Sequence, residues 1–284
     1  MQIRSGLADS RAKAHTVIVA SRNDTSDRLS VNLSFTKFFF VTTRQNDVAA
    51  DQRVRKAGGL IARGFFNDFD VSGARDSQPL ETIQFLVTDR AQESDDGLSS
   101  ATYVAQVSAK YRPRLQDVEA DLRRHLGEHA SVRALDGAVR VPRYTSAEMH
   151  AYAYKAARSR ESGRLMPNVI ILPLSKTAAW WGMTPLDRHT YFYPHTDLAT
   201  GTRRKGHAVT AEAGIPTIYR RLYYNPDGHD QKNQFDFITY FECADPDLGT
   251  FDQVCHALRD EHQNPEWRFV VEGPEWRGRR VLKW

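Results

Sequence analysis

The sequence has little cysteine, and its two cysteines are not spaced as a metal or redox pair. Cys243 and Cys255 lie twelve positions apart, whereas zinc-binding and thiol–disulfide motifs place cysteines within about four residues of each other. The pattern therefore indicates neither a zinc site nor a redox-active pair. It is compatible with a reducing compartment.

The sequence also lacks a long hydrophobic run. Near the N-terminus, the apolar run at residues 16–20 is too short for the apolar region of a secretion signal. It is far too short for a membrane span, which needs about 20 apolar residues. We therefore expect a cytoplasmic protein with no membrane partner.

Charge of one sign does not dominate either. The chain carries 39 lysines and arginines against 35 aspartates and glutamates, a net charge of +4, and the basic residues are scattered. This distribution predicts no nucleic-acid partner. Residues 274–284 are locally basic and contain two tryptophans, and we interpret them as solvated surface. A hydrophobic content of 40% over 284 residues is enough for one large domain or two fused halves.

The common nucleotide and nucleophile motifs are absent as well. We find no GxGxxG, no Walker-type GxxxxGKS/T, no GxSxG and no HExxH. What the sequence does contain is a block at residues 176–221 that is rich in histidine, arginine and aromatic residues. Any chemistry is therefore predicted to lie in this block.

The first half of the chain alternates between predicted strands and a helix. Leu115, Val118, Leu122 and Leu126 recur at helical spacing between Pro113, which suits a first turn, and Gly127, which suits a stop. Charged residues at 45–55 and 92–100 are interpreted as loops. Segments rich in β-branched and aromatic residues predict strands at 33–43, 81–89, 102–110 and 130–141.

The second half repeats this order. Helical composition covers residues 176–193 and 249–262, and predicted strands lie at 168–174, 217–224, 236–242 and 267–271. The repeated order favours an α+β fold with two ferredoxin-like halves, each an antiparallel sheet covered by helices. We divide the chain into a polar segment at 1–30, an N-terminal half at 31–160 and a C-terminal half at 161–284. Residues 143–165 are expected to link the halves.

The block at 176–221 contains every kind of side chain that a haem site needs. Such a site needs a neutral imidazole for the iron, apolar bulk that excludes water, cations for the propionates and a polar group on the ligand side. Lys176 and several arginines supply cations, while the apolar candidates are Trp180, Trp181 and Met183, and the candidate ligands are His189, His195 and His207. A tryptophan pair is also typical of an ordinary core, so composition alone does not decide the point.

Three ordered motifs sharpen this interpretation. The strings KTAAWW, IYRRLYYN and DFITYFE, with a histidine between the first two, resemble the C-terminal half of the chlorite dismutases. The resemblance covers about residues 168–284. It implies a haem b cofactor, two ferredoxin-like halves arranged like a dimeric α+β barrel, and a homo-oligomer that is a dimer, tetramer or pentamer. The cofactor-binding residues that it implies are Lys176, Trp180, Trp181, His207 and Trp267.

The resemblance leaves two histidines for the iron. His195 lies fourteen residues after Trp181, and His207 lies thirteen residues before Arg220. Both spacings match the family, because this chain has extra residues at 195–206. We favour His207 as the metal ligand, since its spacing to the distal arginine is kept and the insertion can be looped out before it. Pro194 also disfavours a regular helix at His195.

The catalytic residue implied by the resemblance is Arg220. A guanidinium is always charged and carries a planar fork of donors, so it can hold a small anionic oxidant at the iron. Arg221 competes for this role, but the alternation of a strand allows only one of the two to face the cofactor. An acid that tunes the proximal histidine is also expected. The register places Gln263 there, and Glu261 or Glu266 are the alternatives.

We therefore expect a haem b-dependent oxidoreductase that decomposes chlorite to chloride and dioxygen, or acts on a related small oxidant. The alternatives are a haem peroxidase of low specificity and a non-catalytic haem-binding protein. A coproheme decarboxylase is less favoured, because those relatives have a tyrosine where this chain has Trp181 and lack the distal arginine.

Overall fold

The structure is a computed structural model that describes residues 34–44, 47–67, 81–89, 96–139, 165–229 and 234–284. The predicted polar segment at 1–30 lies outside the described residues, as does almost all of the predicted link at 143–165. The division of the chain near residues 30 and 160 therefore stays a prediction.

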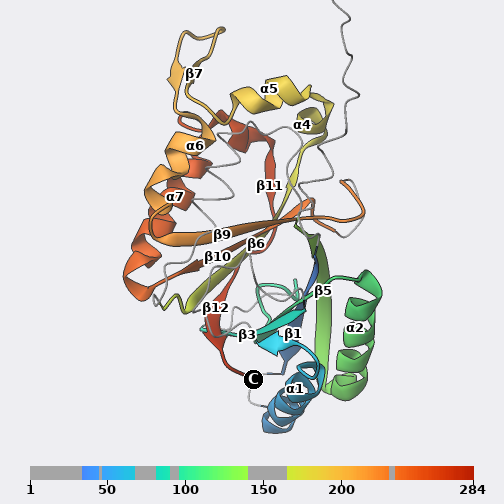
Figure 1. Ribbon diagram of the computed structural model, residues 1–284. Helices are drawn as coiled ribbons and strands as arrows, with labels where there is room; N and C mark the ends of the chain where they lie inside the picture. Colours follow the sequence, from blue (N-terminus) through green and yellow to red (C-terminus); the bar gives the residue numbers. More distant parts are fainter. Residues whose placement is uncertain (1–33, 45–46, 68–80, 90–95, 140–164, 230–233) are drawn as a thin grey trace, which may run out of the picture. The chain divides into compact units, whose positions relative to one another are not determined.

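The first half of the described chain forms an antiparallel sheet with two helices on one side (Figure 1). The strands lie in the order β5-β1-β4-β3, which is the order of a ferredoxin-like βαββαβ unit. A short strand, β2 (Phe66–Asn67), pairs in parallel with β3. The other elements are β1 (Phe35–Thr43), α1 (Val48–Ile61), β3 (Thr82–Thr88), β4 (Tyr103–Ala109), α2 (Arg112–Leu126), the 3₁₀ helix η3 (Gly127–His129) and β5 (Ala130–Ala138).

The second half repeats this topology, with strands in the order β12-β6-β10-β9. Its sheet and the helices that follow β9 are β6 (Asn168–Lys176), β9 (Ile218–Tyr224), β10 (Phe237–Cys243), η6 (Asp245–Asp247), α7 (Leu248–Arg259), η7 (Pro265–Phe269), β11 (Val270–Glu272) and β12 (Trp276–Val281). The connection from β6 to β9 contains α4 (Ala178–Gly182), α5 (Pro185–Thr190), β7 (His195–Thr196), β8 (Arg203–Arg204), α6 (Gly206–Ala211) and η5 (Glu212–Gly214). The predicted α+β fold with two ferredoxin-like halves is confirmed.

The two sheets join at both edges. β12 pairs with β3 over four residue pairs, and β5 meets β9 at Ala138 and Tyr224. Because β6 also pairs with both β10 and β12, the described strands close into a barrel in the order β6-β10-β9-β5-β1-β4-β3-β12. One face of each strand therefore points into the barrel and the other toward the helices.

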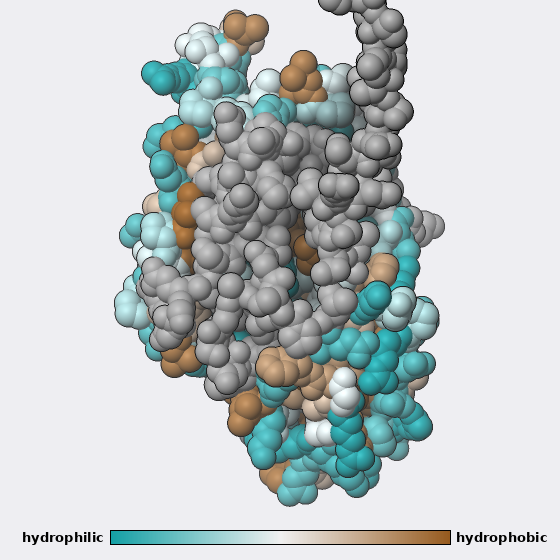
Figure 2. Space-filling model, in the orientation of Figure 1, coloured by the Kyte–Doolittle hydropathy of each residue, from teal (hydrophilic) through white to brown (hydrophobic). Residues whose placement is uncertain are grey.

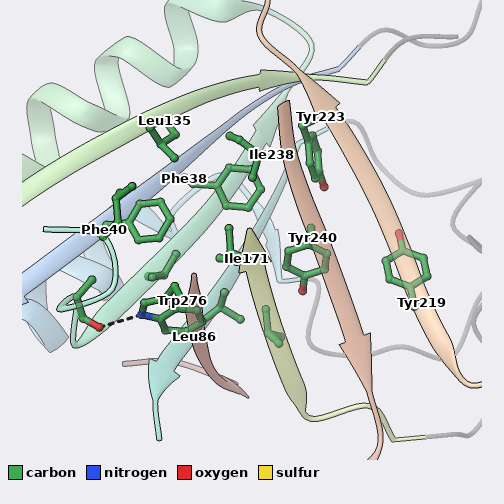
Figure 3. Packing of buried hydrophobic residues seen from close by; sticks show 14 of the residues in the cluster. Phe38, Phe40, Leu86, Leu135, Ile171, Tyr219, Tyr223, Ile238, Tyr240 and Trp276 are labelled. Atoms are coloured by element: carbon green, nitrogen blue, oxygen red, sulfur yellow. Dashed lines mark hydrogen bonds between the residues drawn. The ribbon is translucent and has the colours of Figure 1, made fainter. Parts of the chain in front are cut away.

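The barrel interior is filled by large side chains from both halves (Figure 3). The indole Nε1 of Trp276 donates to the carbonyl oxygen of Ala101 at 2.9 Å, so the largest ring keeps its polar group satisfied. The labelled members of this cluster are Phe38, Phe40, Leu86, Leu135, Ile171, Tyr219, Tyr223, Ile238, Tyr240 and Trp276.

Helices cover the outer faces of the sheet. On the first half, α1 and α2 bury their apolar stripes against the strands, and Trp284 inserts beside them, only 4% exposed. On the second half, α7 packs Phe251 and Cys255 against Ile170, Ile218 and Cys243. Hydrophilic residues predominate over α1 and α2 in Figure 2, as expected for amphipathic helices on a surface.

One predicted loop is wrong and one predicted helix is confirmed. Residues 45–55 were expected to be a charged loop, but α1 begins at Val48, where the Asp47 side chain accepts the Ala50 N–H. Its charges lie on the exposed side, while Ala50, Val54, Ala57, Gly58 and Ile61 are buried at helical spacing. The predicted helix at 113–126 is α2, whose four expected apolar residues are all buried.

The expectation of a solvated tail at 274–284 is also wrong. β12 is an integral strand of the barrel, and Trp276 is 1% exposed. Every second residue points inward, so the outward arginines made the segment look polar. The inward Arg280 pairs with Glu242 at 3.4 Å, and Glu242 also accepts the Tyr240 hydroxyl at 2.5 Å. The charge of this buried arginine is therefore compensated.

Two further boundaries differ from those predicted. The stretch at 176–193 forms two short helices instead of one, because Thr177 and Thr184 each cap a new helix and Met183 between them is extended. The predicted strand at 267–271 begins only at Val270, since Pro265 starts a 3₁₀ helix.

Candidate functional site

A buried ion pair marks the end of β6. The ammonium nitrogen of Lys176 lies 2.5 Å from Oε1 of Glu266, and only 7% of each side chain is exposed. The same ammonium lies 4.1 Å from the ring centroid of Trp180, which is fully buried. This cation–π contact and the ion pair hold Lys176 in the interior, where burial lowers the pKa of its ammonium.

His207 reaches the second oxygen of the same carboxylate. Its Nδ1 lies 3.1 Å from Oε2 of Glu266, and 16% of the His207 side chain is exposed. Burial acts to raise the pKa of Glu266, but the nearby Lys176 and His207 outweigh it and lower that pKa to about 2. Glu266 is therefore a carboxylate held between an ammonium and an imidazole.

The start of α6 fixes the position of His207. The backbone N–H groups of His207 and Ala208 donate to the carbonyls of Tyr191 and Phe192 at 3.0 Å each. Gly206 precedes them with a φ of 74°, and a Cβ there would lie 2.5 Å from the Tyr193 carbonyl oxygen. Only glycine fits this approach without strain.

His195 lies in a different environment. It belongs to the β7–β8 hairpin, where its Nδ1 lies 3.0 Å from the carbonyl oxygen of Tyr193. Its ring meets Tyr191 edge to face, with centroids 6.1 Å apart. Among the described residues no carboxylate accompanies this imidazole, in contrast to His207.

Strand β9 places Arg220 and Arg221 on opposite faces. Tyr219 and Tyr223 point into the barrel, so Arg221 between them shares that face. Ile218 packs against α7, so Arg220 lies on the side that the helices cover. α6 packs on α7 and on η7, which carries Glu266, so His207 and Arg220 lie on the same side of the sheet (Figure 1).

Arg220 is half-buried, and its side chain makes no hydrogen bond or ion pair with any residue of the described part of the chain. A guanidinium in this situation has five donors available to a ligand. Half-buried apolar side chains share its face of the sheet: Leu222 follows it by two positions on β9, and Phe241 lies opposite it on β10. Leu174 lies farther along the same face, opposite Phe237.

Trp181 is fixed at the far end of this face. Its indole Nε1 donates to Oδ2 of Asp236 at 3.0 Å, and the same oxygen accepts the backbone N–H of Lys176 at 2.8 Å. The ring stacks between His229 and Phe237, with centroid distances of 4.5 and 5.9 Å. Asp236, the first residue of the DFITYFE string, was not singled out from the sequence. Its position as the first residue of a string that resembles the family was the available signal.

Trp267 follows Glu266 directly, but its side chain is directed toward β11. Its Nε1 donates to Oε1 of Glu272 at 3.1 Å. The structure therefore brings Lys176, Trp180 and His207 together around Glu266, and it places Arg220 and Trp181 on the neighbouring sheet face. Gln263, which the register put in the place of the acid, instead contacts Lys205. Glu266 was one of the two alternatives.

The described residues contain no group of three or more histidine, cysteine, aspartate or glutamate side chains that could hold a bare metal ion. A zinc or non-haem iron centre needs such a set. A single histidine backed by a carboxylate is instead the pattern of a haem ligand. No helix in the described ranges is long and apolar enough to cross a membrane.

Comparison with known proteins bears on the fold alone. No protein-family model matches the sequence. The structure is similar to chlorite dismutase from Candidatus Nitrospira defluvii in complex with imidazole, with a TM-score of 0.61 and 19% identity over 87% of this chain and 91% of that one. A cyanide complex of a tryptophan variant of that enzyme gives a TM-score of 0.61 and 19% identity over 87% and 90%. A second protein, described as a candidate chlorite dismutase, gives 0.56 and 13% over 88% and 95%.

The resemblance found in three short strings thus extends to the whole topology, including the first half, where the residues themselves gave no match. Two ferredoxin-like halves, a closed barrel and helices on its outer face recur at an identity below 20%. The chain therefore has the fold of the chlorite dismutases.

Proposed function

We propose that the chain is a haem b-dependent oxidoreductase that decomposes chlorite to chloride and dioxygen, with His207 as the iron ligand and Arg220 as the catalytic residue. The observation that carries the proposal is the contact of His207 with Glu266, on the side of the sheet where the guanidinium of Arg220 has no partner among the described residues. Haem, when bound, would supply the redox-active iron.

The residues fit this cofactor. Nδ1 of His207 lies 3.1 Å from Oε2 of Glu266, and Nε2 has no partner among the described residues. A haem ligand needs this arrangement, because one ring nitrogen must be held while the other stays available to iron. The half-buried apolar face that includes Leu174, Leu222 and Trp181 would cover a porphyrin and exclude water.

Glu266 would set the electron-donating power of His207. With its pKa lowered to about 2, the carboxylate is ionised at neutral pH. An anionic acceptor at Nδ1 makes an imidazole a stronger donor through its other nitrogen, which favours oxidised iron. Lys176 holds the carboxylate in place, so its part in cofactor binding is exerted through Glu266, and Trp180 supports Lys176 from behind.

Arg220 would bind the anionic substrate. Chlorite and the oxyanion released from it carry one negative charge, and a guanidinium in a water-poor site attracts such anions strongly. Arg221 cannot share this role while its side chain is on the barrel side of β9. Trp181 would border the pocket. Trp267 instead contacts Glu272, so among the proposed haem-binding residues it has the weakest case for direct contact with the cofactor.

The test has two stages. Purified protein is titrated with haem, and the Soret band is recorded for the wild type, His207→Ala and His195→Ala. We expect stoichiometric binding that is lost or spectrally shifted only in His207→Ala; the reverse result would move the ligand to His195. Haem-loaded protein is then given chlorite in an oxygen electrode. No oxygen above a free-haem control would end the chlorite assignment, and turnover with hydrogen peroxide and a reducing dye would then favour a peroxidase.

The expected homo-oligomer and cytoplasmic location belong to this proposal as well. Size-exclusion chromatography with light scattering should give a multiple of the 32.3 kDa chain mass. A monomer would contradict the expected assembly without affecting the haem assignment.

A further inference from the structure

The β7–β8 hairpin is formed by the extra residues 195–206 that separate the two motifs of the resemblance. His195 pairs with Arg204 and Thr196 with Arg203, both antiparallel. The turn is closed by Gly201 with a φ of 69°, and the Asp197 N–H donates to the Thr202 carbonyl at 2.9 Å. The hairpin is thus an ordered element that projects beside α5 and α6 (Figure 1).

The second strand of this hairpin is attached to the loop that follows α7. The N–H groups of Lys205 and Gly206 both donate to the Gln263 carbonyl at 3.1 Å. The Lys205 ammonium donates to Oε1 of Gln263 at 2.8 Å, and Nη1 of Arg204 donates to the His262 carbonyl at 3.0 Å. We call these four contacts the hairpin–loop junction.

Both sides of the junction lead directly to the candidate site. On one side Gly206 is followed by His207. On the other side Gln263 is followed three residues later by Glu266. The junction therefore lies immediately before the two residues whose side chains meet at 3.1 Å.

The loop itself is held in one conformation by Asp260. Its carboxylate accepts the His262 N–H at 2.9 Å and the Gln263 side-chain amide at 2.8 Å. Asn264 is fully buried and donates from its side chain to the Leu258 carbonyl at 2.9 Å. A displacement of the junction would therefore move a preformed loop relative to α6.

Arg204 is the side chain that joins the hairpin to this loop. One of its terminal nitrogens contacts the His262 carbonyl, and the other lies 3.3 Å from Oδ2 of Asp197 across the hairpin. Only 11% of its side chain is exposed. Arg203, the preceding residue, is exposed, and its side chain has no hydrogen bond or ion pair within the described part of the chain. The two neighbours therefore provide a matched pair of variants.

We propose that Arg204 is a positioning residue and that the hairpin–loop junction sets the contact between His207 and Glu266. The expected effect on the iron–histidine bond rests on the proposed function, but the junction itself can be tested without haem. If the junction is lost, α6 and the loop at 260–264 can shift relative to each other, and the imidazole loses its fixed acceptor. The extra residues would then serve the proximal side of the site.

The first test uses haem-free protein and amide hydrogen exchange. In Arg204→Met we expect exchange at the Lys205 and Gly206 amides to accelerate about tenfold, because their acceptor loop loses an anchor. Asp197→Asn should give a smaller acceleration, since it removes only the contact within the hairpin. Arg203→Met should match the wild type. Equal exchange in Arg204→Met and Arg203→Met would overturn the proposal.

The second test uses haem-loaded protein and the iron–histidine stretching frequency of the ferrous form by resonance Raman. A weaker contact with Glu266 makes the imidazole less anionic and lowers this frequency. We expect a lower frequency in Arg204→Met, an unchanged one in Arg203→Met, and partial recovery in Arg204→Lys. An unchanged frequency in Arg204→Met refutes the positioning role. Failure of the wild type to load haem refutes the proposed function, and the exchange experiment then decides on the junction alone.

Discussion

Lys176 and Glu266 are 90 positions apart in the chain, yet Nζ of the lysine lies 2.5 Å from Oε1 of the glutamate and both side chains are almost fully buried. The ion pair connects the end of β6 to the 3₁₀ helix that precedes β11. It also determines which oxygen of Glu266 remains for His207. The candidate ligand is thus oriented by a contact between the first and last parts of the C-terminal half.

Glu266→Gln should destabilise the protein through Lys176. The glutamine keeps the shape of the glutamate but leaves a buried ammonium without its counter-charge, which typically costs about 3–5 kcal/mol. Urea unfolding should show this loss in the free energy of unfolding. The double variant Lys176→Met/Glu266→Gln should recover much of it, because no buried charge remains. Additive losses in the double variant would show that the two residues do not act as a pair.

Gly206→Ala should disrupt the start of α6. The left-handed backbone costs a non-glycine residue about 1–2 kcal/mol, and the new Cβ would lie 2.5 Å from the Tyr193 carbonyl. We expect a lower unfolding free energy together with weaker haem binding in a Soret titration. Gly201→Ala, which also has a positive φ but no atom within 4 Å of the added Cβ, is the matched control and should keep haem affinity.

Arg220→Ala should reduce oxygen evolution from chlorite without reducing haem content. A correctly placed donor to a developing oxyanion contributes about 10²–10³ in rate. Arg220→Lys keeps the charge but not the forked donors, so it should fall between the wild type and Arg220→Ala. If Arg220→Ala evolves oxygen at the wild-type rate, the arginine has no part in the reaction. Loss of haem in that variant would indicate a binding role instead.

Gly137→Ala should destabilise the barrel. Gly137 lies on β5 facing the interior, where an added Cβ would lie 2.7 Å from Cβ of Tyr223. Overpacking of this kind costs about 1–3 kcal/mol. Gly59→Ala in α1 is the opposite case, because nothing lies within 4 Å and alanine favours a helix by about 0.5–1 kcal/mol. Thermal unfolding should therefore give changes of opposite sign, and a stabilising Gly137→Ala would contradict the packing.

The sequence by itself determined the type of most elements. Apolar residues at helical spacing predicted α2, and β-branched and aromatic runs predicted β1, β3, β4, β6, β9 and β10, because these patterns arise from one buried face. Three ordered strings were enough to predict the fold. Prediction from local sequence was wrong in two places. The tail at 274–284 was expected to be solvated, although Arg280 is compensated by the distant Glu242, and residues 45–55 were expected to be a loop, although their charges occupy only the outer side of α1.

Only the tertiary structure decided which residues of the candidate site lie together. Sequence spacing left His195 and His207 as alternatives and placed Gln263 where an acid was expected. The fold brings Glu266 to His207 and leaves His195 in a hairpin, because β6, α6 and the loop after α7 converge at one end of the sheet. Contacts between segments 60 to 90 residues apart depend on chain topology, and no local pattern records them.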